Sequence, residues 1–145
     1  MQSALISILI PFKNTERFLD ECLQSIQKQT FSNWELLIVD DGSTDTSAKI
    51  VKHYADNDSR IQLISNHGNG IIEALKTGYK HAKGTFITRM DSDDIMSTNK
   101  LEQMQQSLQV HGVGHLALGQ VKYFSKSGNS NVVMSKNSKN IKIFW

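Results

Sequence analysis

The sequence contains a single cysteine and a single proline among 145 residues. With only Cys22, no disulfide can form within the chain, and a reducing compartment is compatible with the composition. No apolar run approaches the roughly 18 residues of a membrane span. The N-terminus also lacks the basic segment of a signal peptide. We therefore expect the chain to be neither exported nor inserted into a membrane, and to associate with a membrane peripherally at most.

An excess of charge of one sign is lacking too. Sixteen basic residues (Lys+Arg 16) balance 14 acidic ones, and the formal net charge is only +2. The lysines are scattered, so we expect no nucleic-acid partner. Asp and Glu do not occur after Glu102. With 39% hydrophobic and 21% charged residues, the chain has the composition of a globular domain able to bury a core.

Short apolar runs alternate with segments whose apolar residues recur at helical spacing. The predicted strands are 5–10, closed by Pro11, then 34–39, 61–65 and 86–90, with further short ones at 116–124, 131–135 and 140–145. The predicted helices cover 15–29, a segment around 48–55, 71–82 and a segment around 101–108. Cys22 lies on the apolar face of the first helix, so we expect it to be buried. This alternation predicts an α/β fold with a mostly parallel sheet flanked by helices.

Four segments follow directly on predicted strands. They are Pro11–Asn14, Asp40 with Asp41, Asn66–Gly70, and Asp91–Asp94. In parallel sheets, ligands bind outside the carboxyl ends of the strands. We therefore expect these segments to share one edge of the sheet and to form the binding site.

Three carboxylates, those of Asp91, Asp93 and Asp94, end the fourth predicted strand. Held close together, they disfavour one another's ionisation, and a shared cation removes that conflict. An Asp-x-Asp pattern places two carboxylates on the same side of an extended backbone. Hard oxygen ligands suit Mg²⁺ or Mn²⁺. A solvated acidic turn is the alternative that the motif alone leaves open.

The segment Asp40–Asp45 offers acids, a glycine and the start of a helix. One acid could accept a hydrogen bond from a nucleobase, and another could accept from ribose hydroxyls. Equally, Ser43 or Thr44 could cap the next helix, with Asp45 in its first turn. The glycines of 66–70 could likewise form only a tight turn, and they lack the spacing of a dinucleotide fingerprint.

Other metal-dependent classes fit the pattern less well. Asp91, Asp93 and Glu102 match three ligand positions of a calcium-binding EF-hand loop, but Met96 stands where that loop needs glycine. The 5 histidines show no metal-ligand pairing in the sequence. A Mg²⁺-dependent phosphoryl-transfer domain of the receiver type would need acids after the first strand and a phosphorylatable Asp after the third. Pro11 follows the first predicted strand here, and the third ends with no acid after it.

Taken together, four segments resemble the N-terminal half of a family 2 glycosyltransferase of the GT-A fold. They are SILIPFKN at 7–14, ELLIVDDGSTD at 35–45, the segment 66–78, and MDSDD at 90–94, in this order and spacing. The resemblance covers residues 4–124, and we expect residues 1–124 to form a nucleotide-sugar-binding domain. Residues 125–145 do not resemble the family, and we expect a divergent or truncated C-terminal segment there.

The resemblance implies a Rossmann-like GT-A fold and transfer of a sugar from a nucleotide-activated donor, commonly with inversion. It places Pro11 and Lys13 on the loop that flanks the nucleobase. Asp40 and Asp41 match the acids that contact base and ribose, and Gly70 belongs to the donor-binding loops. A UDP-sugar is the expected donor.

The resemblance also implies a role for Mg²⁺ or Mn²⁺. Asp93 is the expected metal ligand, and Asp91 is expected to contact the ribose or to reach the metal, directly or through water. Asp94 is a second-rank ligand. A saccharide or lipid-linked acceptor is expected, which would place the protein at the inner face of the membrane.

Family members continue into an acceptor-binding half, where an Asp or Glu acts as general base on the acceptor hydroxyl. We find no counterpart after Phe124, so the general base is not identified in this chain. We expect a donor-binding half, cut short, whose transfer activity is weak or absent. A non-catalytic nucleotide-sugar-binding module is the alternative.

Overall fold

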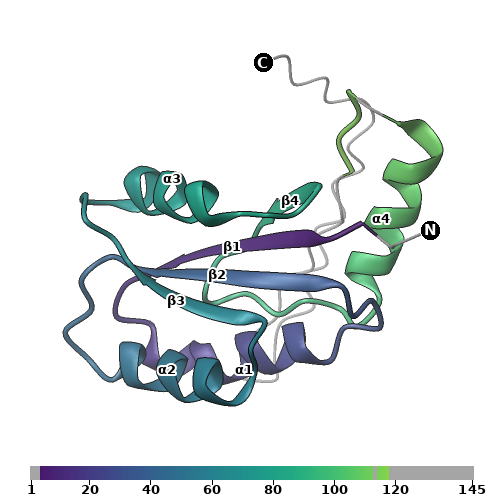
Figure 1. The fold of residues 1–145 in the computed structure, drawn as a ribbon. Coiled ribbons are helices and arrows are strands. Elements are labelled where there is room, and N and C mark those ends of the chain that lie inside the picture. Colours follow the sequence, from purple (N-terminus) through teal and green to yellow (C-terminus); the bar gives the residue numbers. More distant parts are fainter. Residues whose placement is uncertain (1–3, 113, 118–145) are drawn as a thin grey trace, which may run out of the picture.

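Four parallel strands form the centre of the structure, a computed structural model that describes residues 4–112 and 114–117 (Figure 1). They are β1 (Ile6–Phe12), β2 (Trp34–Asp40), β3 (Ile61–Ser65) and β4 (Phe86–Arg89). Their order across the sheet is β3-β2-β1-β4, and every neighbouring pair is parallel. The predicted α/β fold with a parallel sheet is confirmed.

The helices cover the two faces of this sheet unequally (Figure 1). They are α1 (Glu16–Gln27), α2 (Ser47–Asn57), α3 (Ile71–His81) and α4 (Lys100–His111). The first two lie on one face, and α3 lies on the other. The chain steps from β1 to β2 to β3, then returns across the opposite face to place β4 beside β1. Ligands of open α/β sheets bind at such a reversal of strand order, here between β1 and β4.

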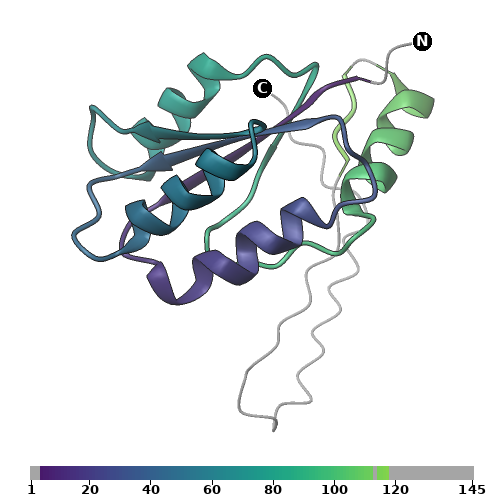
Figure 2. The ribbon, with the colours of Figure 1, turned by 60° about the horizontal axis from the view of Figure 1, so that its bottom comes forward.

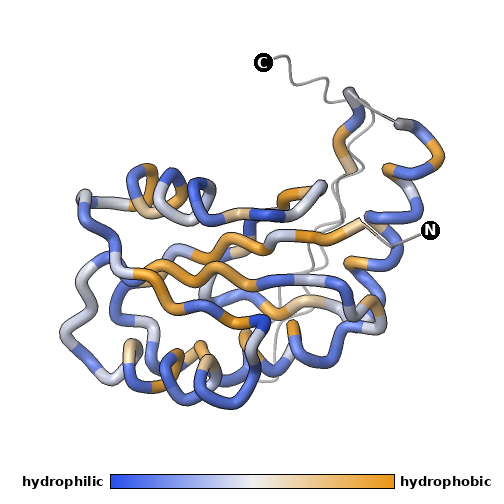
Figure 3. The backbone as a smooth tube through the Cα atoms, viewed as in Figure 1, coloured by the Kyte–Doolittle hydropathy of each residue, from blue (hydrophilic) through white to orange (hydrophobic). Residues whose placement is uncertain are grey.

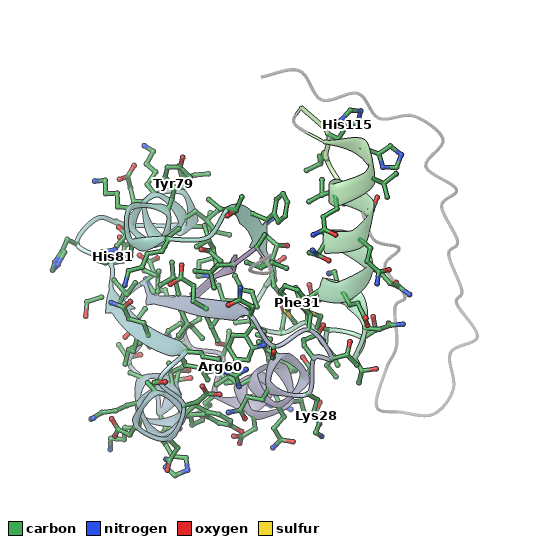
Figure 4. All side chains as sticks on the ribbon, turned by 45° about the vertical axis from the view of Figure 1, so that its right-hand side comes forward. Lys28, Phe31, Arg60, Tyr79, His81 and His115 are labelled. Carbon is green, nitrogen blue, oxygen red and sulfur yellow. The ribbon has the colours of Figure 1, made fainter. Side chains whose placement is uncertain are left out.

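The core is built from the central strands, which are the most apolar part of the chain (Figure 3). Every residue of β1 is buried. Ile8 and Ile10 pack with α1 and α2, whereas Leu9 packs with α3. Cys22 of α1 is fully buried, as predicted. In contrast, α3 turns Tyr79 and His81 away from the sheet (Figure 4).

Pro11 lies inside β1, paired with Val39, although the sequence predicted that the strand would end before it. β4 ends at Arg89, opposite Leu9, so the ladder on that side of β1 stops there. Leu9 turns its carbonyl toward β4 and accepts a hydrogen bond from the N–H of Met90. Pro11, two residues further along, has its backbone directed to the same side as Leu9. Because β4 has already ended there, the N–H that proline lacks has no partner strand to bond.

In Figure 2, α4 lies to one side of the sheet, apart from α2 and α3. The helix is anchored at its first turn by Leu101, which is buried in the main core. None of the described helices is long and apolar enough to cross a membrane. The predicted strands at 131–135 and 140–145, most of the one at 116–124 and the proposed segment 125–145 lie outside the described residues.

Candidate functional site

The loops that follow β1, β2 and β3 meet at one edge of the sheet, at the left of Figure 1. The register pairs Phe12 with Asp40 and Asp40 with Ser65, so these strands end level with one another. β4 ends earlier, opposite Leu9 of β1. The predicted shared edge is therefore present. The Asp-x-Asp segment begins short of this edge, because β4 ends earlier than the other three strands.

Asp41 connects the end of β2 to the start of α3. Its carboxylate accepts a hydrogen bond of 2.6 Å from the Asn66 side-chain amide and one of 3.0 Å from the backbone N–H of Gly70. Gly70 has φ 87°, a conformation that glycine adopts without strain. The Asn66 side-chain oxygen in turn accepts from the N–H of Gly68 at 3.1 Å. Asp41 and Asn66 together hold the loop that precedes α3.

Asn14 joins the loop after β1 to the loop after β2. Its side-chain oxygen accepts hydrogen bonds from the N–H of Thr44 at 2.8 Å and of Asp45 at 3.3 Å. Its own N–H donates to Ser43 Oγ at 3.1 Å. Asn14 has φ 53°, and asparagine is among the few residues enriched in this region. The sequence placed Asn14 in a candidate binding segment, but its role in joining the two loops was not predicted.

The predicted cap of α2 is wrong. The helix begins at Ser47, and Ser43 and Thr44 lie too early to cap it. Instead, the Asp45 carboxylate accepts a hydrogen bond of 2.9 Å from the N–H of Ser47, so Asp45 precedes the first turn. The Asp40 carboxylate accepts from the N–H of Ser43 at 2.8 Å. These contacts fix the acids of the loop in place, and a carboxylate oxygen with one partner still has a lone pair for a ligand.

Pro11 and Lys13 lie at the same edge, at the end of β1. Pro11 is buried, whereas Lys13 is exposed. The N–H of Asp41 donates to the carbonyl of Phe12 at 2.9 Å, which brings the loops after β1 and β2 together. The structure thus gathers five of the six residues predicted for the nucleotide sugar around adjoining strand ends, namely Pro11, Lys13, Asp40, Asp41 and Gly70. The sixth, Asp91, follows β4, which ends earlier.

The Asp-x-Asp segment turns sharply after β4. Ser92 is buried while Asp93 and Asp94 are exposed, and the N–H of Asp94 donates to the Asp91 carbonyl at 3.2 Å. Partial burial raises the pKa of Asp94, and the charges of Asp91 and Asp93 raise it further. Burial, and then the charges of Asp94 and Asp93, likewise raise the pKa of Cys22 beneath the loop to about 12. Negative charges of this segment thus act on one another and on the buried thiol below them.

This donor set fits a hard divalent cation, because it consists of carboxylates that repel one another until a cation is shared. In the described part of the chain, no three His, Cys, Asp or Glu side chains are arranged to enclose a metal. The Asp91 carboxylate is paired with the Arg89 guanidinium instead. A cation here would be held by one or two carboxylates, with substrate phosphates and water as its other ligands.

Ser25 of α1 and Gln29, just after α1, hold the segment 96–101 that follows the three acids. The N–H of Met96 donates to Ser25 Oγ at 3.0 Å. The buried side chain of Gln29 donates to the Ser97 carbonyl at 2.7 Å and accepts from the N–H of Leu101 at 3.1 Å. Gln29 thereby fixes both the loop and the start of α4. Sequence reasoning missed it, because nothing local in the sequence marks a contact with residues so far along the chain.

A parallel sheet with acidic loops at its strand reversal defines a Rossmann-like domain of the GT-A type, and solved structures share this fold. The sequence profile described as Glycosyl transferase family 2 matches residues 7–143, which extends beyond Phe124. The chain belongs to glycosyltransferase family 2.

One curated relative is "UDP-Glc:alpha-D-GlcNAc-diphosphoundecaprenol beta-1,3-glucosyltransferase WfgD" of Escherichia coli. It is 43% identical over 109 residues, which cover 74% of this chain and 42% of WfgD. A crystal structure of S. aureus TarS 1-349 in complex with UDP matches with a TM-score of 0.68 and 27% identity, over 79% of this chain and 38% of the other. The mannosyltransferase PcManGT from Pyrobaculum calidifontis, in complex with GDP-Man and Mn²⁺, matches with a TM-score of 0.58 and 25% identity, over 62% of this chain and 28% of the other.

The chain spans roughly a third of the length of the curated relatives that it matches, for example 36% and 33% of two of them.

Proposed function

We propose that this chain binds a nucleoside-diphosphate sugar and serves as the donor-binding part of a metal-dependent, inverting glycosyltransferase. One observation carries the proposal. The strand order places the loop of Asp40 and Asp41 and the loop of Asp91 and Asp93 on either side of the end of β1. A donor that crosses this end would have its nucleoside at the first pair and its diphosphate at the second.

In this proposal, Pro11 and Lys13 flank the nucleobase, and Asp40 and Asp41 accept hydrogen bonds from base and ribose. Each acid is already held by backbone or amide N–H donors, which fixes its position before the ligand arrives. Such preorganisation favours affinity because less freedom is lost on binding. The N–H of Gly70 supports Asp41 rather than facing outward, so Gly70 acts through that acid.

Asp93 is the proposed metal ligand, with Asp91 as a direct or water-bridged contact and Asp94 of second rank. Bound Mg²⁺ or Mn²⁺ would offset the charge that develops on the departing diphosphate. The carboxylate donor set and the Mn²⁺ in the PcManGT complex support this assignment. Asp93 is exposed, so its carboxylate can reach a cation without rearrangement of the core.

We further propose a UDP-sugar as donor and a saccharide or lipid-linked acceptor. The UDP in the TarS complex and the UDP-Glc in the name of WfgD support the donor, and the diphosphoundecaprenol in that name supports the acceptor. A lipid-linked acceptor would place the reaction at the cytoplasmic face of a membrane, in the synthesis of cell-surface polysaccharide.

A second candidate function is a nucleotide-sugar-binding module without turnover. The observation that favours it is the absence of Asp and Glu after Glu102 in the sequence. Inverting transfer needs a general base at the acceptor hydroxyl, and the usual side chains for that role are missing from this part of the chain. We therefore propose weak or absent transfer by these 145 residues alone.

Thermal unfolding in the presence of nucleotides tests the donor site. With Mn²⁺ present, UDP should raise the melting temperature more than UMP, because only UDP carries the diphosphate that the cation would bind. GDP and CDP test the base preference. No shift with any nucleotide would contradict the donor site. A separate transfer assay with UDP-sugars and saccharide acceptors distinguishes the two functions, since rapid turnover would exclude the module.

A further inference from the structure

Arg89 and Asp91 are held together by the geometry of the strand that they end. Residues two apart in an extended chain project to the same side, so the last residue of β4 and the first acid after it are neighbours by construction. Their side chains form an ion pair and are both about half exposed, at 50% and 47%. Sequence reasoning treated Asp91 as one of three repelling acids and missed the cation that stands beside it.

Arg89 also lies where the chain reverses. It pairs in register with Leu9 of β1, on the face of the sheet that carries α3. Ile87, on the same face of β4, is 44% exposed, so this part of the face is open to solvent. The guanidinium therefore lies where the strand order reverses, between β1 and β4, and beside the loop that carries Asp93. Its exposure leaves it free to adopt other rotamers.

The structure assigns Arg89 a role in binding the anionic diphosphate of the donor. In the free protein Arg89 neutralises Asp91, and when a cation takes the Asp91 carboxylate the guanidinium is released to the phosphate oxygens. This inference rests on the proposed donor site, and it adds a residue that was assigned no role from the sequence.

Both halves of this exchange, the release of Arg89 from Asp91 and its binding to phosphate, are favoured for physical reasons. A half-exposed ion pair contributes little, about 0.2–1 kcal/mol by the usual range, which corresponds to about a 1.4- to 5-fold change in an equilibrium constant. Arg89 therefore competes only mildly with an incoming cation. Guanidinium binds phosphate as well as carboxylate, through paired N–H donors, so the released side chain gains a partner of higher charge.

Two titrations of the 145-residue chain test the inference. Mn²⁺ alone is titrated and followed by the electron paramagnetic resonance signal of the free ion, and UDP is then titrated by calorimetry at saturating Mn²⁺. For Arg89→Gln, we expect Mn²⁺ alone to bind about 1.4- to 5-fold more tightly, because the competitor for Asp91 is gone. We expect UDP to bind about ten-fold or more weakly, because a charge-assisted contact is lost.

Two further variants separate this role from a general effect of charge. Lys52→Gln removes a cation from another exposed ion pair, that with Asp56 on α2, and should change neither titration. Arg89→Lys keeps the charge without the paired donors, so its UDP affinity should lie between those of the wild type and Arg89→Gln. Wild-type UDP affinity in both Arg89 variants would overturn the role of Arg89 and leave the donor site intact. A wild-type chain that binds neither Mn²⁺ nor UDP would overturn the donor site and this inference with it.

Discussion

The carboxylate of Asp41 accepts a hydrogen bond from the backbone N–H of Gly70, 3.0 Å away, and so fixes the end of β2 to the start of α3. The same carboxylate accepts from the Asn66 amide at 2.6 Å. An acid that the resemblance assigns to the nucleotide is thus also the residue that shapes the loop after β3. Its two roles predict that loss of Asp41 affects both stability and binding.

Replacement of Asp41 by Ala should lower the free energy of unfolding by about 1–3 kcal/mol, because the Gly70 N–H and the Asn66 amide lose a charged acceptor. UDP affinity should fall in the same variant. Asp41→Asn keeps an oxygen for Gly70 and should lose less stability. Urea unfolding measures the first effect and calorimetry the second. The exposed acid Asp56, paired with Lys52, offers a control through Asp56→Ala. An Asp41→Ala protein with wild-type stability would contradict this role.

Replacement of Gln29 by Leu should destabilise the protein by about 2–4 kcal/mol, because the Ser97 carbonyl and the Leu101 N–H lose their partner in a buried place. Mn²⁺ affinity should fall as well, since Gln29 holds the loop that carries Asp93. Gln106→Leu, on the exposed side of α4, is the matched control and should change neither property. If Gln29→Leu loses stability but keeps full Mn²⁺ affinity, the claim that Gln29 positions the loop of Asp93 for metal binding is contradicted.

Acid should weaken the protein through Asp58. The Arg60 guanidinium donates to both oxygens of this carboxylate, at 2.9 and 2.8 Å, and lies 3.8 Å from the centre of the Trp34 ring. Hydrogen bonding to Arg60 lowers the pKa of Asp58 from 3.8 to about 2. A depressed pKa in the folded state means that Asp58 contributes its full stability above its ordinary pKa and loses it as pH falls toward 2.

We therefore expect the free energy of unfolding, measured in urea, to decrease as pH is lowered through the interval between these two pKa values. Asp58→Asn should remove that part of the decrease. In the control Asp56→Asn, which alters an exposed acid near the end of α2, the decrease that Asp58 causes should remain. A wild-type slope in Asp58→Asn would show that other carboxyl groups cause the acid sensitivity.

The strands and helices were predictable because each is short, apolar on the required face and bounded by polar residues. β3 spans Ile61–Ser65 as the apolar run predicted, and the other strands differ from their predicted bounds by one or two residues. The shared edge of the sheet followed from alternation alone, since strands joined by helices run parallel. The end of β1 was misjudged because the effect of Pro11 depends on where its neighbour β4 stops.

The contacts that complete the site were not predictable, because their partners lie far apart in the sequence. Asn14 binds the backbone of Thr44, and Gln29 binds that of Ser97, and neither pairing leaves a local pattern. The pairing of Arg89 with Asp91 is the exception. The two residues are only two positions apart in the sequence. Asp91 was interpreted only as an acid that could bind a metal or the ribose, so its pairing with Arg89 was not predicted.

The central claim is that Asp93 supports metal-dependent binding of a nucleoside diphosphate. The most direct measurement is calorimetric titration of the chain with UDP, with and without Mn²⁺, for the wild type, Asp93→Asn and the control Asp56→Asn. We predict binding by the wild type and the control only when Mn²⁺ is present, and binding by Asp93→Asn that is at least about ten-fold weaker. Equal UDP affinity in the wild type and Asp93→Asn, or no binding by a folded wild-type chain, would contradict the account.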